Sequence, residues 1–222
     1  MIRILIALLL LLNSAGLRAG CNDAPGAGVD WSGCSKERLV LTRASLQQGK
    51  FDRAILTGMN FSSADLTGAS FLAAELNRAS FRGAVLEGAR FDKTAAVRSN
   101  FSGARFGAAS LEKAEFLRCN LSDAMLKGAN LSKGDFGRSV FDRADLTGAV
   151  LRHSNLARAR FAGTKLAGAD LSGAFTLGTR VVGTDLSATK GLKQEQLEIA
   201  CGDASTRLPA GLKKPASWPC AD

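Results

Sequence analysis

The sequence predicts an all-β solenoid with four sides, and two periodicities carry this prediction. Every fifth residue from Leu41 to Leu171 is Leu or Phe, with Ala96 as the single exception, and the residue two positions earlier is usually small. A period of five matches neither the helical period near 3.6 nor the strand period of 2. A short, fixed repeat of one large and one small apolar residue therefore indicates stacked coils around a continuous core.

A second period, of twenty residues, gives the number of sides. It appears in the residue that lies two positions after each large apolar residue. One series is mostly glycine and two are basic: Gly68, Gly88, Ala108, Gly128, Gly148, Gly168; Arg78, Arg98, Arg118, Arg138, Arg158; and Lys93, Lys113, Lys133, His153. Because each series keeps its chemistry, four five-residue segments complete one coil.

Two fully written repeats, Ala64-Asp65-Leu66-Thr67-Gly68 and Ala169-Asp170-Leu171-Ser172-Gly173, carry a family resemblance. Over about 41–188 the chain resembles the pentapeptide-repeat proteins. The resemblance implies a right-handed quadrilateral β-helix of about seven coils. In such a helix the large residue and the small residue two positions before it point inward. Paired coils are expected roughly 4.8 Å apart.

The N-terminal segment has the pattern of a secretory signal. Arg3 precedes the apolar run Ile4–Leu12, which is too short to span a bilayer, and small and polar residues follow. We predict a signal peptide at 1–20 and a periplasmic or extracellular protein. A lipoprotein anchored through Cys21 is the alternative, which Arg18, three residues earlier, disfavours.

Five cysteines fit an exported protein. Pairing between neighbours would join Cys21 to Cys34 and Cys201 to Cys220, although the sequence leaves the pairing open. Cys119 takes a small inward position and is predicted to be a buried free thiol. With one histidine and no close cysteine pair, the sequence predicts no metal site, and we expect no cofactor.

The ends of the solenoid are predicted to be capped. Residues 21–40 are assigned to an N-terminal cap in which Trp31 covers the first coil, and 41–188 to the β-helix. Residues 189–222 are assigned to a short helix within Gly191–Gly202 and a disulfide-closed tail. The missing large residue at 96 predicts a local irregularity over Thr94–Val97. The family resemblance implies that the C-terminal end can dimerise, and the oligomeric state stays open.

The basic columns are the one sequence feature with functional content. No catalytic constellation is found, and His153 is predicted to be a solvated corner residue. Glu75, Glu115 and Asp135 lie three residues before column arginines and are expected to neutralise them in part. The two columns are therefore either tolerated on a solvated face or used to bind an anionic partner.

These observations favour a non-enzymatic structural or protein-interaction scaffold of the bacterial cell envelope with an unidentified partner. The alternative is a binder of anionic polymer or of a membrane surface. Some proteins of the resembled family imitate DNA and bind type II topoisomerases through an acidic rod. The net charge of +9 disfavours that role here. Nucleic-acid binding is disfavoured by the predicted compartment and by the lack of surface aromatic residues.

Overall fold

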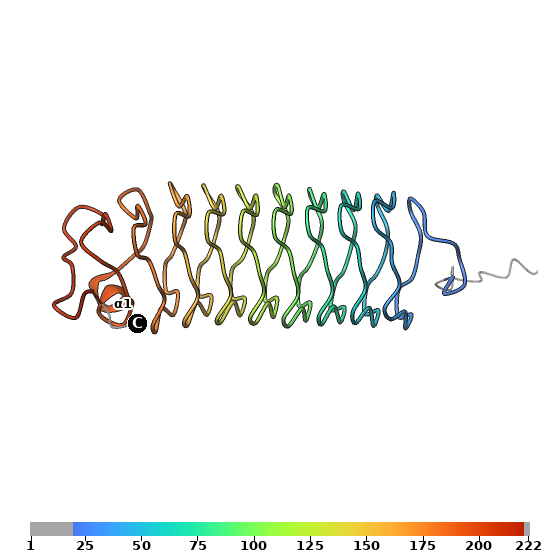
Figure 1. Ribbon diagram of the computed structural model, residues 1–222, viewed down its shortest axis with the longest axis horizontal. Coiled ribbons are helices and arrows are strands. Elements are labelled where there is room, and N and C mark those ends of the chain that lie inside the picture. The colour runs from blue at the N-terminus through green and yellow to red at the C-terminus, as the bar shows by residue number, and fades with distance from the viewer. Residues whose placement is uncertain (1–19, 220–222) are drawn as a thin grey trace, which may run out of the picture.

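The computed structural model describes residues 20–219, which form a rod of stacked coils (Figure 1). The coils follow one another along the long axis, so that the two ends of the described chain lie at opposite ends of the rod. Helix α1 (Gln194–Glu198) lies at the C-terminal end and is the one α-helix within 20–219. The predicted signal peptide at 1–20 lies, apart from Gly20, outside the described residues.

The β-structure consists of single-residue bridges instead of long strands. Parallel bridges join residues twenty apart, as in Asp65 with Val85 and Val85 with Arg105. This spacing is kept from the bridge between Asp30 and Lys50 onward through most of the rod. Four five-residue segments therefore make one coil, which confirms the period of twenty predicted from the sequence.

We number each five-residue segment from its large inward residue. Each segment then has a turn at its second and third residues. In one example, the N–H of Ala64 donates to the C=O of Phe61 at 3.0 Å, and Ser63 between them has a φ of 57°. Between coils, the N–H of Phe61 donates to the C=O of Ser80 at 2.7 Å. The backbone is thus paired along the rod, as a tightly wound chain requires.

The interior is filled by columns of side chains that repeat from coil to coil. Phe61, Phe81 and Phe101 are fully buried, and their ring centroids stack 4.9 and 4.8 Å apart. The residue two positions before each large residue is alanine in most segments and leaves room for these rings. Burial of each large side chain contributes roughly 1.5–3 kcal/mol before conformational entropy is counted, so the core itself holds the rod together.

The predicted irregularity at Thr94–Val97 is wrong. The backbone there keeps the same turn and ladder: the N–H of Ala96 donates to the C=O of Glu115 at 2.9 Å. The ring of Phe116 lies one coil further on and stacks on Phe101 at 4.8 Å, so that Ala96 is fully buried. A neighbouring side chain therefore fills the space that the missing large residue leaves, and the backbone need not bend.

The solenoid begins earlier than the sequence analysis expects. Asp30 already bridges to Lys50, and Trp31 takes the inward position of a large residue with 1% of its surface exposed. The Trp31 ring meets Phe51 edge-on, 5.8 Å between centroids. Residues 30–40 therefore follow the five-residue frame, because Trp31 can fill an inward position that Leu or Phe takes elsewhere.

The cysteines take the predicted places within the described residues. Cys21 and Cys34 form a disulfide with a Cα–Cα distance of 5.5 Å, which ties the N-terminal segment to the first coil. Cys201 is disulfide-bonded, and its expected partner Cys220 lies outside the described residues. Cys119 is free and buried.

Helix α1 and the segment after it lie against the last coils. Leu197 of α1 is buried in the core, and the Gln196 side chain donates to the carbonyls of Leu171 and Ala174, each at 2.9 Å. Beyond α1, Cys201 bridges to Arg180 in parallel. The helix is shorter than the predicted span, and the following chain returns to the β-ladder.

Candidate functional site

One corner of the rod carries an arginine column, which consists of Arg78, Arg98, Arg118, Arg138 and Arg158. Each is the third residue of its segment, with φ between 56° and 60°, and each side chain is exposed. The backbone N–H groups point into the ladder: Arg98 donates to the C=O of Leu117, and Arg118 to that of Gly137, both at 2.9 Å. The ladder fixes the backbone and leaves the guanidinium groups outside.

The turn itself does not require arginine at these positions. The left-handed conformation costs a residue with a side chain roughly 1–2 kcal/mol, and glycine avoids this cost. Gly58 and Gly178 hold the same turn position just before and just after the column, with φ of 70° and 63°. The arginines therefore keep a strained backbone without improving the turn.

A groove with a volume of about 1030 Å³ runs along this arginine corner. We call it the arginine groove. It is lined by the five arginines of the column together with Thr57, Asn77, Val97, Leu117, Gly137, Asn155, Ala157 and Leu177. The lining contains neither an acidic nor an aromatic residue. The groove is thus basic, with an apolar strip beside the arginines.

The arginine column is unpaired. Within 20–219, none of its five guanidinium groups has a carboxylate oxygen within 4.0 Å. The expected neutralisation by Glu75, Glu115 and Asp135 is therefore not found as ion pairing. Asp135 instead accepts hydrogen bonds from the Gly137 N–H at 2.9 Å and from the Asn155 side chain at 3.0 Å.

The lysine column (Lys93, Lys113, Lys133) lies on the neighbouring corner and has a different setting. All three lysines are exposed third residues of their turns. Acidic residues share this corner, and Lys133 pairs with Glu112 at 3.3 Å. His153 continues the column and is also exposed. The sequence predicted both columns, but only one of them lines the large groove.

Sequence reasoning missed the apolar strip of the groove. Val97, Leu117 and Ala157 each come directly before a column arginine, and Leu177 comes directly before Gly178. They lie in one series of twenty-residue spacing, in which Gly137 is the remaining member over 97–177. This period is the signal that could have identified them. They are the second residues of their turns, so they lie beside the third-position side chains.

The family follows from the repeats and the bridges together. A model described as pentapeptide repeats matches residues 60–94, 99–138 and 139–175, with eight copies. The chain belongs to the pentapeptide repeat family. Membership implies that the β-helix is right-handed.

Solved structures of pentapeptide repeat proteins are similar to this one at low identity. HetL, involved in heterocyst differentiation regulation in the cyanobacterium Nostoc sp., is 23% identical over 82% of this chain and 92% of its own, with a TM-score of 0.41. Trypsin-treated QnrB1, a plasmid-mediated fluoroquinolone resistance protein, is 19% identical over 80% and 90%, with a TM-score of 0.41. Rfr23 from the cyanobacterium Cyanothece is 19% identical over 64% and 88%, with a TM-score of 0.24. No curated protein matches the chain.

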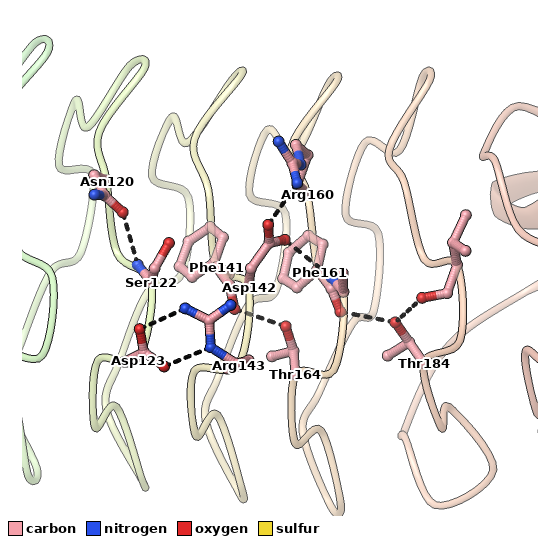
Figure 2. Close-up of polar contacts among 12 residues, drawn as sticks. Asn120, Ser122, Asp123, Phe141, Asp142, Arg143, Arg160, Phe161, Thr164 and Thr184 are labelled. Atoms are coloured by element: carbon pink, nitrogen blue, oxygen red, sulfur yellow. Dashed lines mark hydrogen bonds and ion pairs between the residues drawn. The ribbon is translucent and has the colours of Figure 1, made fainter. Parts of the chain in front are cut away.

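This pentapeptide repeat protein also has a paired cluster, formed by Asp123, Arg143, Asp142 and Arg160 (Figure 2). Arg143 donates to both oxygens of Asp123, with Nε–Oδ1 at 2.8 Å and Nη2–Oδ2 at 2.7 Å. Arg160 donates to Oδ2 of the buried Asp142 at 2.7 Å. The hydrogen bond from Arg143 holds the pKa of Asp123 below its ordinary value. In contrast to the arginine column, this cluster satisfies its own charges.

The buried thiol of the pentapeptide repeat protein has a structural setting. Cys119 Sγ donates to the carbonyl of Ala96 at 2.7 Å, and burial raises the pKa of the thiol to about 12. A thiol in this state is inert, because the thiolate is the reactive form.

In the described part of the chain, no helix has the length and apolarity that a bilayer span needs.

Proposed function

We propose that this protein is a non-enzymatic interaction scaffold that binds its partner along the arginine column. The single observation that supports this most strongly is the arginine groove, in which five exposed guanidinium groups lie without a carboxylate partner. The repeat fold favours interaction over catalysis, because its interior is filled by apolar side chains and its surface repeats from coil to coil.

The proposed location is the bacterial cell envelope, either the periplasm or the cell exterior. Two observations support it. The apolar run Ile4–Leu12 follows a basic residue, as in a signal peptide. The Cys21–Cys34 disulfide fits an oxidising compartment. Mass spectrometry of the mature N-terminus would distinguish cleavage before Cys21, lipidation of Cys21 and an uncleaved chain.

We propose that both ends act as caps that keep the rod from stacking end to end. At the N-terminal end, Trp31 and the Cys21–Cys34 disulfide close the first coil. At the C-terminal end, α1 packs Leu197 on the core, and the side-chain amide of Gln196 donates hydrogen bonds to two carbonyls of the last coils. Open ends of a β-helix would otherwise invite aggregation. Deletion of 189–222 is expected to convert the protein into higher oligomers on size-exclusion chromatography.

The scaffold proposal is tested by charge reversal with a matched control. The variant R98E/R118E/R138E reverses the middle of the arginine column, and K93E/K113E/K133E makes the same change in charge on the lysine column. Crosslinked envelope extract is captured on each protein, and the retained material is compared. We expect the arginine variant to lose the partner that the wild type and the lysine variant retain. Equal capture by all three proteins would contradict the proposal.

A second candidate function is the binding of an anionic polymer, and the shape of the site favours it. The arginine groove continues over successive coils and contains no acidic residue. A long polyanion could contact all five arginines at once. A type II topoisomerase is not proposed as a partner, because the exposed column is basic, whereas the family members that imitate DNA are acidic.

A further inference from the structure

We propose that the occupant of the arginine groove is a single chain of a linear acidic polysaccharide with a carboxylate on its sugars, lying parallel to the rod axis. This inference rests on the proposed function, namely that the arginine column is a binding surface. It adds the chemical class of the partner and the direction in which it lies. Four independent features of the groove lead to it.

The first feature is the repeat of the charges along the axis. Parallel bridges join consecutive coils, so the five arginines follow one another at roughly 4.8 Å and the column spans on the order of 20 Å. A partner with one charge per unit along a straight chain meets every arginine. A sugar ring is of the same order of length as this spacing, so each unit can face about one coil.

The second feature is the choice of arginine. The guanidinium group is a planar fork that binds a carboxylate through two parallel hydrogen bonds, whereas the lysine ammonium acts as a point charge. All five groups are exposed and lack a carboxylate within the described residues. The paired cluster shows the same fork in use in this protein: Arg143 binds both oxygens of Asp123. A carboxylate from outside can take the same geometry on the column.

The third feature is the backbone of the groove. The N–H groups of Arg78, Arg98 and Arg118 already donate to carbonyls one coil further on, at 2.9–3.0 Å. An extended peptide that adds to a sheet edge needs free backbone N–H groups as well as free carbonyls, and these arginines offer no free N–H. Recognition must therefore go through side chains, which favours a polymer recognised by its charged groups.

The fourth feature is the apolar strip beside the arginines. Val97, Leu117 and Ala157 are half-buried and give the groove an apolar strip. The C–H faces of sugar rings can pack against such a strip, whereas polyphosphate has no apolar surface to place there. Single-stranded nucleic acids need aromatic platforms for their bases, and the groove lining has none. A flat membrane cannot enter a groove between side chains.

The probe for the test is a galacturonate oligomer long enough to span the column, titrated by calorimetry against the wild type and three variants. R98Q/R118Q/R138Q removes three forks, and K93Q/K113Q/K133Q removes the same charge from the lysine column. We expect the arginine variant to bind on the order of tenfold more weakly or worse, and the lysine variant to stay within about twofold. R98K/R118K/R138K keeps the charge and is expected to lose affinity too, because it loses the forks. Circular dichroism verifies that each variant is folded.

Three further ligands complete the test. The methyl-esterified oligomer lacks the carboxylates and should not bind. Polyphosphate and oligo-dT of equal charge should bind more weakly than galacturonate. The inference is overturned if the arginine and lysine variants lose affinity equally, because attraction would then follow net charge alone. It is also overturned if polyphosphate or oligo-dT binds as tightly as galacturonate.

The outcome can be separated from that of the scaffold proposal. If galacturonate does not bind but R98E/R118E/R138E still loses an envelope partner, the polysaccharide inference fails and the scaffold proposal stands. If neither galacturonate binding nor envelope capture depends on the column, both fail. If both depend on it, the retained envelope material should be released by free galacturonate oligomer.

Discussion

The arginine column and the paired cluster are built on the same turn and differ in what lies one coil away. Arg143 and Asp123 are twenty residues apart at equivalent corner positions, and they neutralise each other. Arg98 and Arg118 are also twenty residues apart at equivalent positions, and they carry the same charge. The solenoid brings any residue beside the one twenty positions later, so opposite charges at that spacing can neutralise a corner and like charges cannot.

This comparison also separates stability from function. The paired cluster contributes hydrogen bonds to the folded rod, and the buried Asp142 additionally accepts the Ala162 N–H at 3.1 Å. The arginine column has the same left-handed turn residues as Asp123 and Arg143 of the paired cluster, but it contributes mutual repulsion where the cluster has ion pairs. A feature that costs stability and is repeated in five consecutive coils is where we expect function to lie. The following predictions test this contrast, from the largest expected effect to the smallest.

The largest effect concerns the core beneath the two corners. Phe116→Ala removes a buried ring just before an arginine-column turn, and Phe141→Ala removes one just before a paired-cluster turn. Each should lower the free energy of unfolding by about 3–5 kcal/mol, because a cavity replaces a large side chain. Urea denaturation followed by circular dichroism measures both. A much smaller loss for Phe116→Ala would mean that the core beside Ala96 is loose, and the two corners would then differ inside as well.

The second effect concerns backbone strain. Arg118→Gly removes the backbone strain of a left-handed residue with a side chain, and it removes the repulsion between Arg118 and its arginine neighbours. It should raise the free energy of unfolding by about 0.5–1 kcal/mol. Arg143→Gly relieves the same strain but loses the bidentate pair with Asp123, so it should gain less. Thermal and urea unfolding of the two variants give the comparison. If Arg118→Gly destabilises the rod, the column has a structural role that the contacts do not reveal.

The third effect concerns salt. R98Q/R118Q/R138Q removes repulsion between exposed charges and should raise the melting temperature at low ionic strength. The difference from wild type should shrink as added salt shortens the screening length to about 3 Å at 1 M. Arg143→Gln should show the opposite sign at low salt, because it removes an attraction. Melting curves across a salt series measure both changes in melting temperature. If both variants shift the melting temperature in the same direction at low salt, the two regions do not differ as proposed.

The smallest effect concerns pH. The pKa of Asp123 is lowered by its hydrogen bond to Arg143, so the pair contributes stability above the unfolded-state pKa. That contribution is lost as the pH falls through the lower, folded-state pKa, when the carboxylate becomes protonated. Asp123→Asn should therefore differ from wild type at neutral pH and converge with it in strong acid. Arg98→Gln should keep its difference over the same range, because guanidinium stays charged. Urea unfolding at several pH values measures both differences.

Much of this molecule could be predicted from its sequence because a solenoid repeats one local rule. The five-residue spacing of Leu and Phe predicted the inward columns, and the twenty-residue spacing predicted the arginine column. Cys119 takes a position that is alanine in most segments, so its burial could also be predicted. In each case the neighbour in space lies at a fixed distance in sequence.

The rest needed side chains in three dimensions. Ala96 predicted a local irregularity, but the backbone there is regular, and the ring of Phe116 one coil away stacks on Phe101. Trp31 extends the frame to a segment that looked irregular. Glu115 and Asp135 lie close in sequence to column arginines, yet their side chains do not pair with them within the described residues.

By itself, then, the sequence determined the coil, its four sides and the place of every basic column, because covalent spacing sets the winding of a repeat that fills its own core. Only the tertiary structure decided which charges are satisfied. Ion pairing depends on the direction of long side chains across coils, and a period does not encode that direction. The tertiary structure thus showed that Asp135 bonds to Gly137 and Asn155 and leaves the nearby arginine column without a carboxylate partner in 20–219.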